Sequence, residues 1–326
     1  MVMFSIIIPV KSINDYVRET VPHIQRLAGP QWELMVIPNE EEPNEWPDDG
    51  RVRVFPSGRV GPAAKRDMGA AQAKGVILVF LDDDSYPAVD LLVVAERFFA
   101  DESIVALGGP AITPPDDGFW QRVSGAVFLS KFSGGAPERY VPVGKARPVQ
   151  DWPSVNLMVR KSDFLAIGGF DSPYWPGEDT KLCLDLVQKT RKTIMYVPEM
   201  QVWHHRRAGL GAHLRQVGAY GLHRGYFAKK YPQTSCRPMY FAPSVFLIFS
   251  AATLISPFTQ IESSRIFSIG WSFYALALFI AWIDIRKYEY VGVAAAAMVY
   301  LPLTHLVYGF RFIQGIFLIN LVSNLR

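Results

Sequence analysis

The stretch that decides the fold is Val76-Ile77-Leu78-Val79-Phe80-Leu81-Asp82-Asp83-Asp84-Ser85, in which six apolar residues run directly into three carboxylates. A continuous apolar run of this length, preceded by Lys74-Gly75 and followed by Pro87, is typical of a strand that is covered on both faces of a parallel sheet. Ligands bind such sheets beyond the carboxyl ends of the strands. The three aspartates therefore stand where a ligand is expected.

Carboxylates in this position favour a metal ion. Side chains alternate along an extended chain, so we expect Asp82 and Asp84 to face one side and Asp83 the other. A hard cation such as Mg²⁺ or Mn²⁺ is commonly held by one or two carboxylates together with the phosphates of a substrate. The pattern predicts a site for a divalent cation and a diphosphate. A solvated acidic turn that caps the next helix is the alternative that the triplet alone leaves open.

The segments around this stretch alternate between strand and helix patterns. Strands are expected at residues 4–10, 32–37, 52–55, 76–81, 104–107, 152–160, 193–197 and 200–203, and helices at 14–27, 62–73, 91–100, 180–189 and 211–229. Pro22 is expected to kink or split the first of these helices. Connections of ordinary length in this order predict an α/β domain with a mostly parallel sheet and right-handed crossovers.

The composition changes near Met239. The chain has 326 residues, of which 50% are hydrophobic, and apolar residues are concentrated toward its end. Residues 240–258, 266–283 and 291–310 are nearly free of charge, and each is about as long as the roughly twenty residues that cross a bilayer. We expect a globular domain at 1–235 and an anchor of about three transmembrane helices at 236–326. Buried core helices are the alternative, and the tail after residue 310 is open to an interfacial position or a further crossing.

The distribution of basic residues predicts the orientation of these segments. Arg224, Lys229, Lys230 and Arg237 precede the first segment and Arg286 and Lys287 separate the second from the third, whereas the loop at 259–265 holds one arginine. Basic residues stay on the cytoplasmic side, and Phe4 to Pro9 is too short for a signal-peptide core. We therefore expect a multi-pass protein of the inner (plasma) membrane with a cytosolic first domain and an outside C-terminus. A net charge of +3 gives no support to a nucleic-acid partner.

Three other segments carry polar or amphipathic patterns. Glu178 and Asp179 precede a helix expected from about Thr180, where amide groups and the helix dipole stabilise carboxylates, so ordinary capping is the alternative for this pair. The strand at 200–203 ends in His204-His205-Arg206-Arg207. Residues 119–129 fit either a helix on the membrane surface or core packing.

Six short motifs in this order resemble those of family 2 glycosyltransferases of the GT-A fold. They are Ser-Ile-Ile-Ile-Pro-Val at 5–10, Ala64-Lys65-Arg66-Asp67-Met68-Gly69, Phe80-Leu81-Asp82-Asp83-Asp84, Gly168-Gly169-Phe170-Asp171, Gly177-Glu178-Asp179 and His204-His205-Arg206-Arg207. The resemblance covers residues 4 to about 235. It is closest to membrane-anchored members that build exopolysaccharide, O-antigen or other lipid-linked glycans, including the succinoglycan type.

The resemblance implies a role for each matched residue. Asp82, Asp84 and His204 would hold a divalent cation, Mg²⁺ or Mn²⁺, that bridges the phosphates of the donor. Asp179 would be the catalytic base of an inverting transfer, and Glu178 would help to position the acceptor. Donor binding would fall to Pro9 and Val10 at the nucleoside, Arg66 and Asp67 near the phosphates, Asp82 and Asp83, and Arg206 and Arg207 at the departing nucleoside diphosphate.

Two departures from the family pattern bear on the function. Ile37-Pro38-Asn39 stands where the family usually has an aspartate that reads the base, and the Gln-x-x-Arg-Trp motif of processive synthases is absent after Trp203. We expect transfer of one sugar per encounter, from a nucleotide-sugar donor to a hydroxyl of a (poly)prenyl-linked glycan at the membrane surface, in polysaccharide or glycoconjugate biosynthesis. The alternatives are a polyprenyl-phosphate monosaccharide synthase, whose acceptor needs no base, and a non-catalytic membrane scaffold that binds a nucleotide-sugar.

Overall fold

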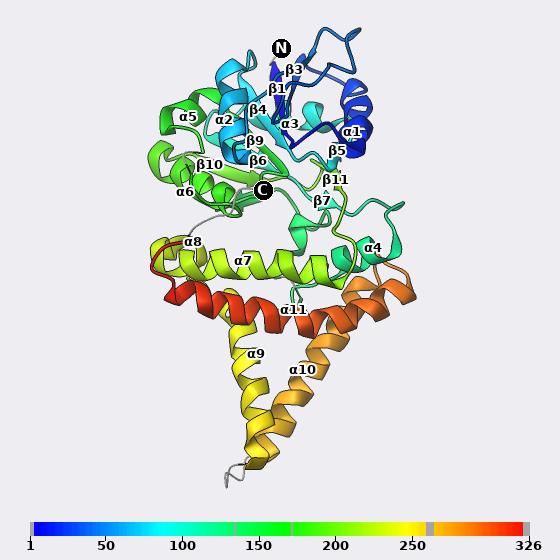
Figure 1. Ribbon diagram of the computed structural model, residues 1–326, viewed down its shortest axis with the longest axis vertical. Coiled ribbons are helices and arrows are strands. Elements are labelled where there is room, and N and C mark those ends of the chain that lie inside the picture. The colour runs from blue at the N-terminus through cyan, green and yellow to red at the C-terminus, as the bar shows by residue number, and fades with distance from the viewer. Residues whose placement is uncertain (1–2, 134, 171, 259–263, 322–326) are drawn as a thin grey trace. The chain divides into compact units, whose positions relative to one another are not determined.

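The computed structural model describes residues 3–133, 135–170, 172–258 and 264–321, and these fall into two compact units (Figure 1). Unit 1 comprises residues 3–112 and 141–205, and unit 2 comprises 113–140 and 206–321. Three parts of the sequence considered above lie outside the described residues: Asp171 of the fourth motif, the loop residues 259–263 and the tail residues 322–326. The division at residue 235 stays a prediction.

Unit 1 is organised around a mostly parallel sheet, as predicted. Within the described residues the sheet has eight strands in the order β3-β2-β1-β4-β9-β6-β10-β8. They are β1 (Phe4–Pro9), β2 (Trp32–Ile37), β3 (Val52–Val54), β4 (Ile77–Leu81), β6 (Ile104–Gly108), β8 (Arg147–Val149), β9 (Asn156–Arg160) and β10 (Thr193–Tyr196). Strand β9 is antiparallel to β4 and β6, and β8 is antiparallel to β10.

A second, smaller sheet follows the acidic stretch. It consists of β5 (Ser85–Pro87), β11 (Val202–His204) and β7 (Ala111–Ile112), in which β11 is antiparallel to β5 and parallel to β7. The register pairs His204 with Ser85. Strands β5, β7 and β8 were not predicted, because each has only two or three residues and its partner is distant in the sequence.

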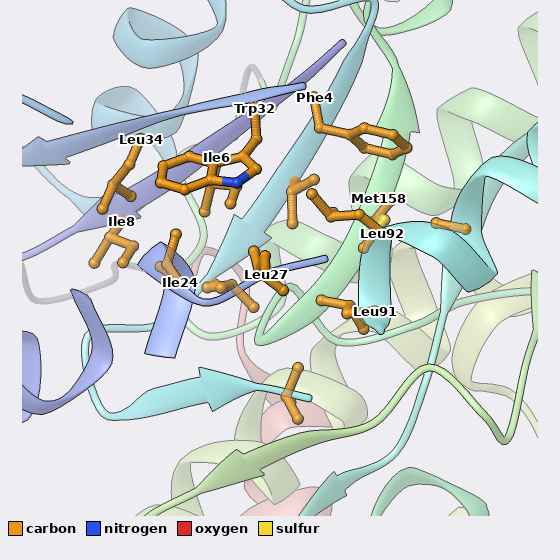
Figure 2. Close-up of a cluster of buried hydrophobic side chains, with 14 of the residues drawn as sticks. Phe4, Ile6, Ile8, Ile24, Leu27, Trp32, Leu34, Leu91, Leu92 and Met158 are labelled. Carbon is orange, nitrogen blue, oxygen red and sulfur yellow. The ribbon is translucent and has the colours of Figure 1, made fainter. Parts of the chain in front are cut away.

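The sheet of unit 1 is covered on both faces, which explains why its central strands are apolar throughout. All residues of β1 and β4 are buried. Phe4, Ile6 and Ile8 of β1 belong to one core cluster and Ile7 to another, as side-chain alternation requires. Figure 2 shows the first cluster, with Phe4, Ile6, Ile8, Ile24, Leu27, Trp32, Leu34, Leu91, Leu92 and Met158 labelled.

The helices of unit 1 supply the covering layers. They are α1 (Asp15–Gln25), α2 (Pro62–Gln72), α3 (Leu91–Phe99), α5 (Lys161–Ile167) and α6 (Glu178–Thr190). Asn14 caps α1 by accepting a hydrogen bond from the amide of Val17 at 3.0 Å. Of the two outcomes expected at Pro22, a kink or a split, the split does not occur, since α1 continues through the proline. Burial of Val17 and Ile24 offsets the one backbone hydrogen bond that proline removes.

Unit 2 is helical. It contains α4 (Phe119–Ala126), η1 (Pro137–Arg139), α7 (Leu210–Lys230), α8 (Pro232–Ser235), α9 (Pro238–Ile255), η2 (Ser256–Phe258), α10 (Ser264–Ile285) and α11 (Val291–Phe317). Among the described residues, three segments are long and apolar enough to cross a membrane, namely Pro238–Phe258, Arg265–Ile285 and Val291–Phe317. These are the three segments that the sequence predicts, and the third extends seven residues beyond its expected end.

Candidate active site

The acidic stretch lies at the carboxyl edge of the sheet. Strand β4 pairs in parallel with β1, in the register Phe4 with Ile77 and Ile7 with Phe80, so both strands end at the same edge. Asp82, Asp83 and Asp84 follow the last residue of β4 directly. The buried strand β4 thus places the carboxylates at the edge where parallel sheets bind ligands.

Asp82, Asp84 and His204 converge beyond this edge. Each of the three side chains offers a ligand atom within 4.8 Å of the other two. Nε2 of His204 lies 3.1 Å from Oδ1 of Asp84, and the backbone amide of His205 donates to the carbonyl oxygen of Asp84 at 3.0 Å. The pairing of β11 with β5 brings the histidine to the two aspartates, although about 120 residues separate them in the chain.

The donor set of this cluster suits a divalent cation. Carboxylate oxygens are the preferred ligands of Mg²⁺ and Mn²⁺, and imidazole is a common ligand of transition metals. The side chains of Asp84 and His204 are 9% and 15% exposed, whereas that of Asp82 is 34% exposed. Asp82 therefore leaves one side of the cluster accessible to a substrate oxygen.

Asp83 has a hydrogen-bond partner outside the cluster. Its Oδ2 accepts a hydrogen bond from Nδ2 of Asn14 at 2.7 Å. Burial, together with the neighbouring charge of Asp84, raises the pKa of Asp83 to about 6. Asn14, which caps α1, therefore also orients the middle carboxylate.

Arg66 connects the acidic stretch to the start of α6. Its side chain is 3% exposed, and it donates from Nη2 to Asp82 at 2.6 Å and from Nη1 to Glu178 at 3.2 Å. Burial and the nearby charge of Asp179 raise the pKa of Glu178 above its usual range. The guanidinium group compensates two carboxylates that come from distant parts of unit 1.

Asp179 lies in the first turn of α6, which begins at Glu178 rather than near Thr180 as predicted. Its Oδ1 accepts a hydrogen bond from the backbone amide of Thr180 at 2.7 Å. Gly177, the residue before the helix, has a φ of 112°, a conformation that glycine adopts at little cost. The turn that it makes sets Glu178 and Asp179 side by side at the helix N-terminus.

Asp67 fastens the glycine-containing loop to α2. Its Oδ1 accepts a hydrogen bond from the backbone amide of Phe170 at 2.9 Å. Gly169 has a φ of 74°, and a Cβ atom at this position would overlap the same carboxylate oxygen. Asp67 and the loop at 168–170 thus fit each other only because residue 169 is a glycine.

Lys65 is a buried cation that sequence analysis did not identify as a site residue. Its Nζ donates to the carbonyl oxygen of Val10, to that of Ile37 at 3.2 Å and to Oδ1 of Asn39 at 2.6 Å. Burial lowers the pKa of Lys65 to about 8. The lysine thereby joins the carboxyl ends of β1 and β2. The only signal in the sequence is the pair Lys65-Arg66 within a helix of small residues.

The other residues of the predicted site divide between the two units. Pro9 ends β1 opposite Ile37 of β2, so Pro9 and Val10 belong to unit 1 with the aspartates, His204, Arg66, Asp67, Glu178 and Asp179. Arg206 and Arg207 belong to unit 2. There Arg206 donates from Nε to Oγ1 of Thr113 at 3.1 Å and from its amide to Asp117 at 3.2 Å.

His205 has different surroundings from His204. Its Nε2 lies 3.0 Å from Oε2 of Glu19, and its ring stacks on Tyr16 with the centroids 4.7 Å apart. The geometry therefore gives the two adjacent histidines different surroundings, and His204, which the resemblance assigned to the metal, is the one beside the aspartates. His204 belongs to the carboxylate cluster, and His205 packs against α1.

Comparison with known proteins finds one family whose model matches part of this chain. Residues 5–151 match the model of the family described as glycosyl transferase family 2. The pre-mycofactocin glycosyltransferase of Mycobacterium tuberculosis, in two strains, is 30% identical over 172 residues, which are 53% of this chain and 36% of the relative. The aligned region thus spans about a third of the length of these curated relatives.

The structural comparison agrees with the family match. The mannosyltransferase PcManGT from Pyrobaculum calidifontis, solved in complex with GDP-Man and Mn²⁺, superimposes with a TM-score of 0.57 at 17% identity, over 91% of this chain and 86% of that protein. This likeness extends to the arrangement of strands and helices. The match to glycosyl transferase family 2 covers less than half of the chain, and the fold is GT-A with additional C-terminal helices.

Proposed function

We propose that this chain is an inverting, metal-dependent glycosyltransferase that transfers one sugar from a nucleotide-sugar to a hydroxyl of a (poly)prenyl-linked glycan at the membrane surface. The convergence of Asp82, Asp84 and His204 at the carboxyl edge of β4 is the observation that carries the proposal. The match of residues 5–151 to glycosyl transferase family 2 and a fold shared with a mannosyltransferase solved in complex with GDP-Man and Mn²⁺ support it.

Donor binding is assigned to the residues at the carboxyl ends of β1 and β4. A divalent cation, when bound by Asp82, Asp84 and His204, supplies the positive charge that lets a diphosphate approach two carboxylates. Arg66 holds Asp82 in place and adds a fixed positive charge near the phosphates. Pro9 and Val10 flank the nucleoside, while Asp83 and Asp67 support the donor site from either side. Arg206 and Arg207 stabilise the departing nucleoside diphosphate.

Asp179 is assigned the role of the general base. In the transfer, the acceptor oxygen forms a bond to the anomeric carbon from the face opposite the diphosphate, and the bond from that carbon to the phosphate oxygen breaks. Asp179 takes the hydroxyl proton, and the electron pair leaves with the nucleoside diphosphate. Glu178, held by Arg66, positions the acceptor. Such a base contributes about 10²- to 10⁴-fold when it is within hydrogen-bond reach of the hydroxyl.

The C-terminal helices support a membrane-bound acceptor. Three segments are apolar enough to cross a membrane, and a polyprenyl-linked glycan remains at the bilayer surface. We place residues 1–235 in the cytosol as the catalytic part and residues 236–326 in the inner (plasma) membrane as the anchor. Holding the site at this surface confines the search for the acceptor to two dimensions.

Calorimetry with the full chain in detergent tests the proposal. UDP, GDP, dTDP and CMP are titrated in Mn²⁺ or Mg²⁺, with and without EDTA. We expect one nucleotide to bind only with the metal, and we expect binding to be lost in His204→Ala but kept in the matched control His205→Ala. Binding that EDTA leaves unchanged would refute metal dependence. Binding of none of the four would count against a preformed donor site and favour the scaffold or a site that assembles only on its lipid acceptor.

A further inference from the structure

Helices α7 and α11 of unit 2 run parallel to each other in close contact. A Cβ atom at Gly221 of α7 would lie 2.6 Å from the carbonyl oxygen of Tyr308 in α11, and one at Gly225 would overlap that of Phe312. His213 and Thr304 are joined by a hydrogen bond of 2.8 Å nearer the start of both helices. Residue numbers rise together in the two helices, which shows the parallel direction. Small residues let the two backbones touch over several turns.

Helix α7 is too charged to lie in the hydrocarbon core of a membrane. It carries Arg215, Arg224, Lys229 and Lys230 and contains no Asp or Glu, and it is not among the candidate spans within the described residues. Each Lys or Arg at the bilayer centre costs about 2.5–3.5 kcal/mol even on the most permissive scale. Because α11 is packed along α7, α11 cannot cross the membrane unless α7 crosses beside it.

Helices α9 and α10 behave differently from α11. Within the apolar 18-residue stretch of each helix, 6% of the residues of α9 and of α10 are buried, whereas the share in α11 is 39%. Ser244 of α9 contacts α11 by donating from Oγ to the carbonyl oxygen of Gly309 at 3.1 Å, and Tyr274 of α10 contacts His305 at 3.0 Å. Beyond these contacts both helices leave the α7–α11 pair and converge at their far ends (Figure 1). At about 1.5 Å per residue, 18 and 22 residues are close to the roughly 30 Å of a hydrocarbon core.

One stripe of α11 is apolar and exposed. Val299, Phe310 and Phe317 are 62%, 60% and 79% exposed. Their spacing of eleven and seven residues places them within about 20° of one another around a helix of 3.6 residues per turn. Trp120 of α4, which is 51% exposed, stacks on Tyr300 of α11 with the centroids 6.2 Å apart. Aromatic side chains of this kind are enriched at membrane interfaces.

We propose that the α7–α11 pair lies in the plane of the membrane surface and binds a leaflet that contains anionic lipids. The stripe formed by Val299, Phe310 and Phe317 enters the boundary between headgroups and acyl chains, and the cations of α7 lie at the level of the lipid phosphates. The chain then crosses the bilayer twice, through α9 and α10. The end of α11 lies on the same side as α7, in place of the outside C-terminus expected from hydropathy.

Depth measurements test the in-plane position of α11. Single cysteines at Val299, Phe310 and Phe317, in full-length protein with Cys183 and Cys236 changed to serine, receive a nitroxide label in nanodiscs of phosphatidylcholine and phosphatidylglycerol. We expect the same depth at all three positions. A spanning helix would separate Val299 from Phe317 by about 27 Å along the membrane normal. The matched control is the pair Val245→Cys and Leu254→Cys on α9, where both positions are exposed. Because α9 crosses the membrane, these two labels should differ in depth by about 13 Å.

Sidedness supplies an independent test. Asn320→Cys follows the end of α11, Phe258→Cys marks the far end of α9, and the native Cys236 precedes α9. A membrane-impermeant maleimide is added to right-side-out and inside-out vesicles, with Cys183 changed to serine throughout and with Cys236 kept only where it is the reporter. We expect Asn320→Cys and Cys236 to react in the same type of vesicle, and Phe258→Cys to react only in the other type. Labelling of Asn320→Cys together with Phe258→Cys would establish the third crossing and overturn the proposal.

Discussion

The Nη2 atom of Arg66 lies 2.6 Å from Oδ1 of Asp82, which ties helix α2 to the first carboxylate after β4. The same guanidinium group reaches Glu178 through Nη1, 112 residues further along the chain. Arg66 is therefore the one described cation that pairs directly with both the acidic stretch and the start of α6. Its charge compensates in part for the burial that raises the pKa of Glu178.

Arg66→Gln should destabilise unit 1 and weaken donor binding. Removing one member of a buried ion pair costs about 3–5 kcal/mol because the remaining charge is left without compensation. The thermal midpoint of the purified chain in detergent measures this loss. Arg59→Gln is the matched control, because Arg59 pairs with Glu40 at the surface, where the side chains are 84% and 68% exposed; such a pair contributes about 0–1 kcal/mol.

The double variant Arg66→Gln/Glu178→Gln separates charge compensation from packing. If the uncompensated charge of Glu178 causes the loss, the second substitution should recover part of the midpoint lost in Arg66→Gln. Equal midpoints for Arg66→Gln and the wild-type chain would show that the ion pairs contribute nothing to stability. If the double variant loses more of the thermal midpoint than the two single variants lose together, packing and not charge would be the cause.

Asp84→Asn and Asp179→Asn should affect different steps. Asp84→Asn should raise the dissociation constant of the nucleotide in Mn²⁺ by about ten- to hundredfold, because it weakens the metal cluster. Asp179→Asn should leave that constant nearly unchanged and lower kcat by about 10²- to 10⁴-fold. Calorimetry and release of nucleoside diphosphate measure the two quantities. An equal loss of donor binding in both variants would contradict the separate roles, and a fully active Asp179→Asn variant would favour a phosphate acceptor.

Local patterns were sufficient to predict the elements that carry the candidate site. The apolar run at 76–81 gave strand β4 to within one residue, since burial on both faces leaves a continuous hydrophobic signal. Asp82, Asp83 and Asp84 were expected on extended chain but lie in a turn, which the amide of Ser85 closes by donating to the carbonyl oxygen of Asp82 at 3.2 Å. The start of α1 was predicted to within one residue, because helix starts depend on capping residues that are close in sequence.

Contacts between distant segments could not be predicted in the same way. Strand β11 brings His204 to Asp84 through its pairing with β5, a three-residue strand with no periodic signal of its own. The buried positions of Lys65 and Arg66 depend on neighbours 16 to 112 residues away. Hydropathy identified α11 as apolar but gave no information on α7 as its neighbour, because the packing of two helices depends on glycines rather than on average composition.

Gly225→Ala should disrupt the packing of α7 against α11. A Cβ atom at this position would overlap the carbonyl oxygen of Phe312, and a backbone atom cannot give way as a flexible side chain can. We expect a lower thermal midpoint in detergent, by an amount typical of overpacking, about 1–3 kcal/mol.

Gly211→Ala is the matched control for this substitution. Gly211 lies in the same helix. A Cβ atom there would have an ordinary van der Waals contact with Nη1 of Arg215, at 3.6 Å. Alanine is favoured over glycine in a helix by roughly 0.5–1 kcal/mol, so this variant should be as stable as the wild-type chain or more stable. If both variants shift the midpoint equally, close approach of the two helices is not what Gly225 provides.

The stability of unit 2 should fall as the pH drops from about 6.5 toward 4. His213 is fully buried on α7, and burial lowers its pKa to about 4, whereas the unfolded chain has the ordinary value of about 6.5. The unfolded state therefore takes up the proton first as the pH falls. Each pH unit between these two values costs about 1.4 kcal/mol, and no contribution from this group remains above about pH 7.5.

His213→Gln should flatten this pH dependence, because glutamine cannot take up the proton. Burial also lowers the pKa of His223, so a smaller slope of the same sign should remain. Thr304→Val is the control, because it removes the hydrogen-bond partner of His213 but not its burial, and the slope should persist at a lower overall stability. The test measures thermal midpoints from pH 4.5 to 7.5 in one detergent. If the midpoint changes with pH equally in His213→Gln and in the wild-type chain, the titration of this histidine is not linked to unfolding.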